Sequence, residues 1–93
     1  MNLVNTLIIG AGRSGTTSLY AYLEKHPEVN FSITKELHYF SIPDLYSRGE
    51  NYFHSLFTDR NKKIVATADT YLLLDTDAPA RVKAYNANMK III

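Results

Sequence analysis

A glycine-rich segment that directly follows a short apolar run constrains this 93-residue chain more than any other feature. Residues 3–9 carry enough aliphatic side chains for one buried strand, and Gly10, Gly12 and Gly15 then interrupt the run. Three hydroxyl side chains follow at residues 16–18, where a helix is expected to begin. The N–H groups of such a turn and of a first helical turn lack partners within the helix, so together with the hydroxyls they can bind an anion.

Two interpretations of this segment stay open from the residues alone: a phosphate-binding loop, or an ordinary strand-to-helix turn without a ligand. Arg13 favours the first, because guanidinium groups form strong charge-assisted hydrogen bonds with phosphate. Gly10 and Gly15 match the spacing of the nucleoside-triphosphate loop, but Thr16 stands where that loop has the lysine that contacts the β- and γ-phosphates. The missing lysine argues against phosphoryl transfer and leaves a kinase-like enzyme with an altered loop as the alternative.

The octapeptide Gly-Arg-Ser-Gly-Thr-Thr-Ser-Leu at residues 12–19 resembles the 5′-phosphosulfate-binding loop of sulfotransferases that use 3′-phosphoadenosine 5′-phosphosulfate (PAPS). Residues 26–27 (His-Pro), 35–40 (Lys-Glu-Leu-His-Tyr-Phe) and 70–72 (Thr-Tyr-Leu) follow in the order seen in the carbohydrate and bacterial branches of that family. The resemblance covers nearly the whole chain, which corresponds to roughly the first third of a typical family domain. It implies that PAPS is the co-substrate and that seven residues bind it: Gly12, Arg13, Ser14, Gly15, Thr16, Thr17 and Ser18.

The segment from Thr34 to Phe40 combines a charge pair with a histidine. In an extended conformation Glu36 and His38 lie on one side of the strand, and from spacing alone a solvated pair of Lys35 and Glu36 is the simpler interpretation. The resemblance implies more, because a glutamate in this Glu-x-His-aromatic-Phe setting is the general base of the carbohydrate sulfotransferases. By that resemblance Glu36 is the base, Arg13 offsets developing charge, and His38 orients the base or contacts the substrate.

The chain departs from the family pattern at residues 66–69, where Ala-Thr-Ala-Asp replaces polar and proline positions. Asp69 or Thr70 can compensate, since a polar residue at the carboxyl end of a parallel strand faces the usual ligand side of the sheet. Either residue equally fits a helix cap or a turn, and both interpretations stay open. His26, beside Pro27 at the end of the first predicted helix, is interpreted as a structural partner of the helix dipole.

Composition excludes several classes of function. The chain has no cysteine, its three histidines lack ligand spacing, and its net charge is +1, so the sequence predicts no metal site and no nucleic-acid partner. The apolar start is too short for a signal peptide or a membrane span, which predicts a cytoplasmic protein without a membrane segment. A small-molecule or carbohydrate acceptor is the expected partner.

The predicted fold is an α/β layer with a P-loop-like, mainly parallel sheet flanked by helices, formed by residues 1–93 as the amino-terminal part of one sulfotransferase-like domain. Buried strands are expected at residues 64–67 and 89–93 and a loop at 42–49, with helices at 15–25, 50–57 and from about 75 to 87. The apolar end Ile-Ile-Ile lacks cover, which predicts a truncated domain that self-associates.

The function implied by the resemblance is transfer of a sulfuryl group from PAPS to an acceptor hydroxyl or amine. Besides the kinase-like enzyme, an inactive fragment or assembly module is the remaining alternative, since the isolated chain is expected to be incomplete and inactive.

Overall fold

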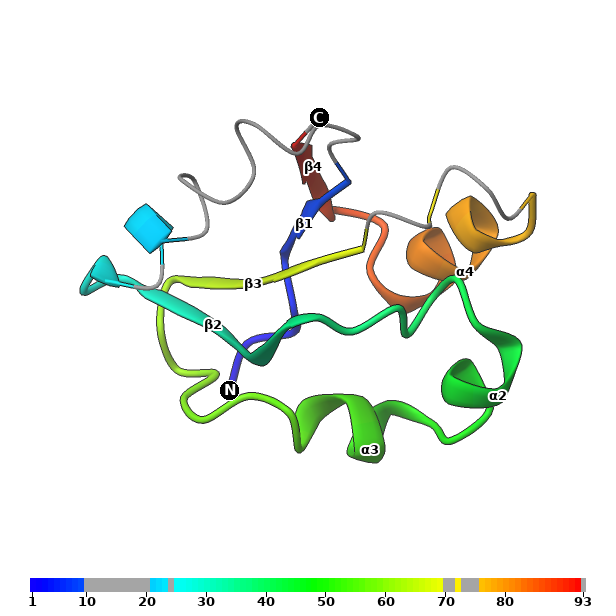
Figure 1. Cartoon of the computed structure of the whole chain (residues 1–93), viewed down its shortest axis with the longest axis horizontal. Helices are drawn as coiled ribbons and strands as arrows, with labels where there is room; N and C mark the ends of the chain where they lie inside the picture. Colours follow the sequence, from blue (N-terminus) through cyan, green and yellow to red (C-terminus); the bar gives the residue numbers. More distant parts are fainter. Residues whose placement is uncertain (10–20, 24, 70–71, 73–75, 93) are drawn as a thin grey trace.

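A computed structural model describes residues 1–9, 21–23, 25–69, 72 and 76–92 of the chain. Within these residues four strands form one sheet in the order β2-β3-β1-β4, and every neighbouring pair is parallel. The strands are β1 (Thr6–Ile8), β2 (Val29–Glu36), β3 (Ile64–Ala68) and β4 (Lys90–Ile92). The parallel α/β sheet predicted from the sequence is therefore confirmed (Figure 1).

The central strands show the alternation that places apolar side chains on both faces of a covered sheet. Leu7 and Val65 belong to the larger core cluster, whereas Ile8, Ala66 and Ala68 belong to a smaller cluster on the other face. All five side chains are at most 1% exposed. Both faces of β1 and β3 are thus buried, as the continuous apolar runs in these segments predict.

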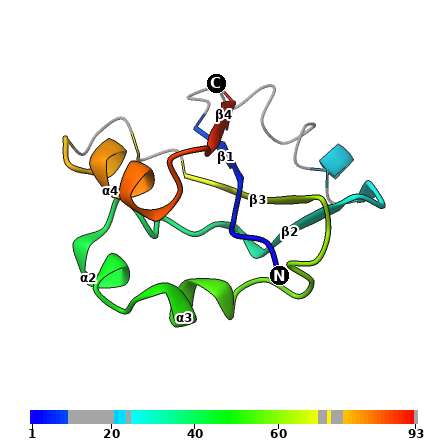
Figure 2. The same ribbon diagram turned by 180° about the vertical axis from the view of Figure 1, so that it is seen from behind.

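Three helices follow the strands in the described part of the chain: α2 (Pro43–Tyr46), α3 (Glu50–His54) and α4 (Ala78–Tyr85). In Figures 1 and 2, α2 and α3 lie on one side of β2 and β3, and the helical residues 21–23 lie on the other side. Leu23 accordingly packs against the smaller cluster, and α4 contributes Val82 and Tyr85 to the larger one.

Aromatic rings dominate the larger core cluster. Phe53 is fully buried and stacks on Tyr39, with ring centroids 4.1 Å apart and planes 5° from parallel. Its edge-to-face neighbours are Phe40, Phe57 and Tyr85. A fully buried phenylalanine contributes about 1.5–3 kcal/mol through removal of its apolar surface from water, so these contacts hold α3 and α4 against the sheet.

Two expectations about local structure are wrong. The segment predicted as a loop contains α2, because Pro43 fits the first turn of a helix and Asp44 complements its dipole, although the Pro-Asp-Ser-Gly composition is typical of a loop. The strand predicted as buried is largely exposed: Ile91 is 43% exposed, and among the described strands β4 lies at an edge and pairs with β1 alone. An edge strand leaves one side of its backbone uncovered.

The ends of the other two predicted helices differ from the observed ends by only a few residues. The helix expected over residues 50–57 ends at His54, and the helix expected to reach residue 87 ends at Tyr85, where Asn86 is extended. The strand β2 was not among these expectations and spans eight residues, from Val29 to Glu36.

Candidate functional site at the carboxyl edge of the sheet

The carboxyl ends of the central strands meet at one edge of the sheet, which we call the carboxyl edge. The Asp69 N–H donates to the Ile8 carbonyl at 2.9 Å, and the Ile9 N–H donates to the Ile92 carbonyl at 2.8 Å. The chain therefore leaves β1 between the ends of β3 and β4 and enters the glycine-rich segment there. Ligands of open parallel sheets bind outside this edge.

The predicted phosphosulfate-binding residues 12–18 lie outside the described residues, as does Thr70. Their roles remain predictions. The structure shows where the glycine-rich segment begins, which is just after the end of β1.

Glu36 is the last residue of β2 and is the register partner of Ala68, next to the end of β3. The register shifts between Phe31 and Glu36, and the Leu37 N–H donates to the Ala68 carbonyl at 3.2 Å. The backbone of the predicted base thus lies at the carboxyl edge, two strands away from the start of the glycine-rich segment.

His38 begins a tight turn rather than continuing the strand. Its φ is 49°, a left-handed conformation that non-glycine residues seldom adopt, and its carbonyl accepts from the N–H groups of Ser41 at 3.2 Å and Ile42 at 3.0 Å. The extended alternation expected to place Glu36 and His38 on one side of a strand is therefore wrong, because β2 ends at Glu36.

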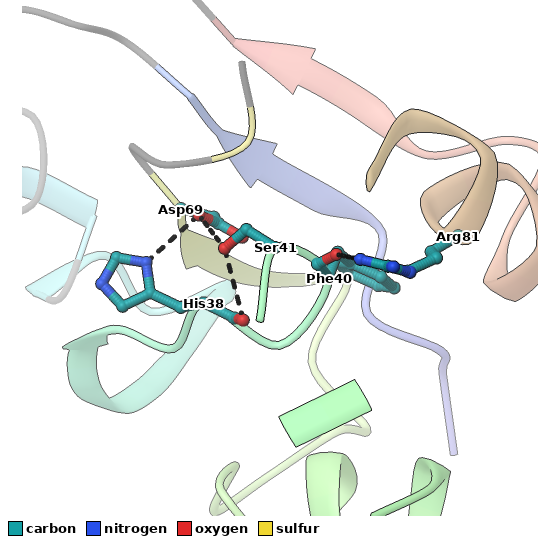
Figure 3. A network of polar contacts seen from close by, with 5 residues as sticks. All are labelled: His38, Phe40, Ser41, Asp69 and Arg81. Carbon is teal, nitrogen blue, oxygen red and sulfur yellow. Dashed lines mark hydrogen bonds and ion pairs between the residues drawn. The ribbon is translucent and has the colours of Figure 1, made fainter. Parts of the chain in front are cut away.

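The turn is fixed from β3 by the carboxylate of Asp69, which is 1% exposed. Oδ1 of Asp69 lies 3.2 Å from His38 Nδ1 and accepts a hydrogen bond from Ser41 Oγ at 3.0 Å (Figure 3). Asp77 occupies the position before α4, so Asp69 does not cap that helix. Its carboxylate stabilises the turn at residues 38–41, and a role on the ligand side stays a prediction.

A second contact fixes the turn from α4. Arg81 Nη1 donates to the Phe40 carbonyl at 2.9 Å, and the guanidinium lies 5.6 Å from the centre of the Tyr46 ring (Figure 3). Between these contacts Tyr39 and Phe40 insert into the core. Burial raises the pKa of the Tyr39 phenol, and the nearby Tyr46 and Glu50 raise it further, so Tyr39 anchors the turn as a neutral group.

Ser41 and Arg81 were missed by reasoning from the sequence. Ser41 carries a weak local signal, since a serine three residues after His38 fits a side-chain turn motif. Arg81 lies 41 residues from Phe40 and carries no local signal for this contact.

The described part of the chain contains neither a membrane-spanning helix nor a cluster of metal ligands. No helix there is long and apolar enough to cross a membrane. No group of three or more histidine, aspartate or glutamate side chains in the described ranges is arranged to hold a metal ion.

Comparison with known proteins places these features in a family. The Sulfotransferase family model matches residues 6–90. Over 95 residues the chain is 30% identical to the membrane-associated sulfotransferase kil1 of Dictyostelium discoideum, with 98% of this chain and 20% of that protein covered. It also resembles the crystal structure of a sulfotransferase from Alicyclobacillus acidocaldarius, with a TM-score of 0.81 and 29% identity over 98% of this chain and 43% of that chain. The chain therefore spans less than half the length of these relatives, and within that span it belongs to the sulfotransferase family.

Proposed function

We propose that this chain carries the donor-binding loop and the general base of a sulfotransferase that uses PAPS. The observation that supports the proposal most strongly is convergence at the carboxyl edge: β1 ends there one residue before the glycine-rich segment begins, Asp69 follows the end of the neighbouring β3, and Glu36 ends β2 on the other side of β3. Donor and acceptor groups must meet within a few ångströms for group transfer, which this topology allows.

The loop residues would bind the anionic end of the donor. Backbone N–H groups around Gly12 and Gly15, the guanidinium of Arg13 and the hydroxyls of Thr16, Thr17 and Ser18 are groups that bind a phosphosulfate. In this proposal Arg13 also offsets the negative charge that develops on the oxygen bridging phosphorus and sulfur. Ser14 contributes its backbone.

The proposed reaction is an in-line displacement at sulfur. The acceptor oxygen or nitrogen forms a bond to sulfur while the bond from sulfur to the bridging oxygen breaks, and the nucleotide leaves with both electrons of that bond as 3′-phosphoadenosine 5′-phosphate (PAP). Glu36 takes the proton of the acceptor, a contribution typically worth about 10²–10⁴-fold in rate. The acceptor is a hydroxyl- or amine-bearing small molecule or carbohydrate.

Isothermal titration calorimetry with PAP tests the donor assignment. We expect PAP to bind without magnesium and more tightly than ATP with magnesium, because Thr16 replaces the lysine of nucleoside-triphosphate loops. Arg13→Ala should weaken PAP binding by roughly 1.5–3 kcal/mol.

Arg48→Ala is the matched control, because Arg48 lies over the Tyr52 ring at 5.1 Å and belongs to the connection between α2 and α3, which Figure 1 shows well away from the end of β1. It should leave PAP affinity unchanged. Equal affinities for wild type and Arg13→Ala would remove Arg13 from the donor site, and magnesium-dependent preference for ATP would favour the kinase-like alternative.

A further inference from the structure

We propose that the edge of the sheet opposite the glycine-rich segment carries a binding site for a small zwitterion, a molecule with a carboxylate and a protonated amine such as a free amino acid. We call this edge, where β1 and β3 begin, the amino edge. A hollow of about 390 Å³ lies there along the end of α3 and the connection to β3, and its lining includes His54, Asp59 and Arg60. In this proposal Arg60 and His54 bind the carboxylate of the ligand, and Asp59 binds its amine.

Asp59 and Arg60 carry opposite charges, and within the described part of the chain neither forms an ion pair. Arg60 Nη1 donates to the Asn2 carbonyl at 2.9 Å, and Nη2 contacts Met1 Sδ at 3.5 Å. Asp59 Oδ1 accepts a hydrogen bond from the Asn61 N–H at 3.0 Å. The partner atoms are uncharged, so these contacts orient the two charged groups and leave their charges to act on a ligand.

The backbone that carries both charges is fixed from two other parts of the fold. Asn30 of β2 is buried; its Oδ1 accepts from the Asp59 N–H at 3.1 Å, and its Nδ2 donates to Thr58 Oγ1 at 2.9 Å. Ahead of β1, the Asn2 N–H donates to the Arg60 carbonyl at 2.7 Å. Groups that are already held in place lose less conformational freedom when a ligand binds.

His54 contributes a neutral N–H donor to the same hollow. The Val4 N–H donates to the Tyr85 oxygen at 2.8 Å, and that oxygen lies 2.7 Å from His54 Nε2. Burial raises the pKa of Tyr85 to about 12, so the hydroxyl keeps its hydrogen, which has a partner only when it is donated to Nε2. Neutral His54 then carries its own proton on Nδ1, which makes no hydrogen bond with any described residue.

One positive and one negative group on the same hollow favour a ligand that carries both charges. A simple anion would be attracted by Arg60 and repelled by Asp59, and a simple cation would meet the reverse. PAP has several negative charges and no ammonium group for Asp59, so we expect it to bind elsewhere. Phe57 and Met1 add apolar surface to the lining, which favours an amino acid with an aliphatic side chain.

Three related compounds test the need for both charges. L-leucine has the carboxylate and the ammonium group, N-acetyl-L-leucine lacks the ammonium group, and L-leucinamide lacks the carboxylate. In ¹H–¹⁵N correlation spectra of the labelled 93-residue chain, L-leucine should shift the amide signals of His54, Asp59 and Arg60. Each analogue should bind at least about tenfold more weakly, as the loss of one charge-assisted contact predicts.

Substitutions test the two charged side chains. Arg60→Gln and Asp59→Asn should each weaken L-leucine binding by about tenfold or more. Asp59→Asn keeps an oxygen that can accept from the Asn61 N–H, so it separates the charge from the local turn. Lys63→Gln is the matched control, because Lys63 is exposed at the same edge and lies outside the lining of the hollow. It should leave the affinity unchanged.

The absence of shifts at the solubility limit of L-leucine, or equal affinities for L-leucine and either analogue, would overturn the proposal. Wild-type affinity in folded Asp59→Asn would also overturn it. If Arg60→Gln does not fold, the three compounds and the Asp59→Asn variant still decide. These measurements contain no PAP, so their outcome is independent of the proposed sulfotransferase function.

Discussion

Two histidines at opposite edges of the sheet make similar contacts in different surroundings. At the carboxyl edge, His38 contacts a buried carboxylate through one nitrogen. At the amino edge, where β1 begins, His54 Nε2 lies 2.7 Å from the hydroxyl of Tyr85, which accepts a hydrogen bond from the Val4 N–H at 2.8 Å. Both histidines thus link distant segments of the chain.

The two networks differ in the groups that they contain and in their burial. The amino-edge network connects α3, α4 and β1, and burial keeps its side chains neutral: it raises the pKa of Tyr85 to about 12 and lowers the pKa of His54. The carboxyl-edge network contains a buried carboxylate, a strained backbone and a partly exposed histidine side chain. The first arrangement stabilises the fold, whereas the second lies at the edge of the sheet outside which ligands of open parallel sheets bind.

The largest expected effect separates rate from stability at the carboxyl edge. In a form of the protein with measurable activity, Glu36→Gln should lower turnover by at least about a hundredfold, because glutamine cannot take the acceptor proton, and should leave PAP affinity nearly unchanged. Turnover at saturating PAPS and acceptor is the measurement, with thermal melting as the check on folding.

Glu50→Gln is the matched control, because Glu50 is an exposed residue at the start of α3. Its turnover should equal that of the wild type. A folded Glu36→Gln variant with near-normal turnover would exclude Glu36 as the base and direct attention to Asp69 and His38.

A substitution at the amino edge should instead lower the stability of the fold. Tyr85→Phe removes the hydroxyl that accepts from the Val4 N–H, so a buried donor loses its partner and the free energy of unfolding should fall by about 1–3 kcal/mol. Tyr22→Phe, at a side chain 64% exposed, should change it by less than about 0.5 kcal/mol. Urea denaturation gives both values, and equal stabilities of the two variants would show that the Tyr85 hydroxyl contributes nothing.

A smaller expected effect is the pH dependence of the free energy of unfolding. Burial lowers the pKa of His54, with a further lowering from Arg60 and an opposing effect of Glu50. The unfolded chain therefore binds this proton more readily, so the contribution of His54 to stability is fully present above its unfolded pKa of about 6.5 and is lost as the pH falls through the lower folded pKa. Urea denaturation in this range should show a steeper pH dependence for wild type than for His54→Gln, and identical slopes would contradict the assignment.

Sequence predicted the parts of this molecule that depend on local pattern. The apolar runs of β1 and β3 were sufficient for these strands, because burial on two faces leaves a continuous apolar run. The helix that contains α4 was predicted in part from Val82 and Tyr85, which the structure buries. The 43% exposure of Ile91 agrees with the expected lack of cover over the apolar end and not with a buried strand, and the place of β4 at an edge of the described sheet follows from the strand order alone.

The candidate site was predictable only in part, because its contacts join residues that are distant in the sequence. Glu36 and His38 were identified through a motif, but the contact of His38 with Asp69 joins residues 31 apart in sequence. It also depends on a positive φ at His38 that a continuous strand would not have, and no pattern in residues 34–40 indicates where β2 ends.

The most direct test of the contrast between the edges is chemical-shift mapping with PAP on the ¹⁵N-labelled chain. A hollow of about 390 Å³ at the amino edge, lined in part by His54, Asp59 and Arg60, offers an anion the competing site. Binding at the carboxyl edge should shift the amide signals of Ile9, Leu37 and Asp69 and leave those of Val4, His54 and Arg60 unchanged. Shifts confined to the second set, or no shifts at saturating PAP, would contradict a donor site at the carboxyl edge.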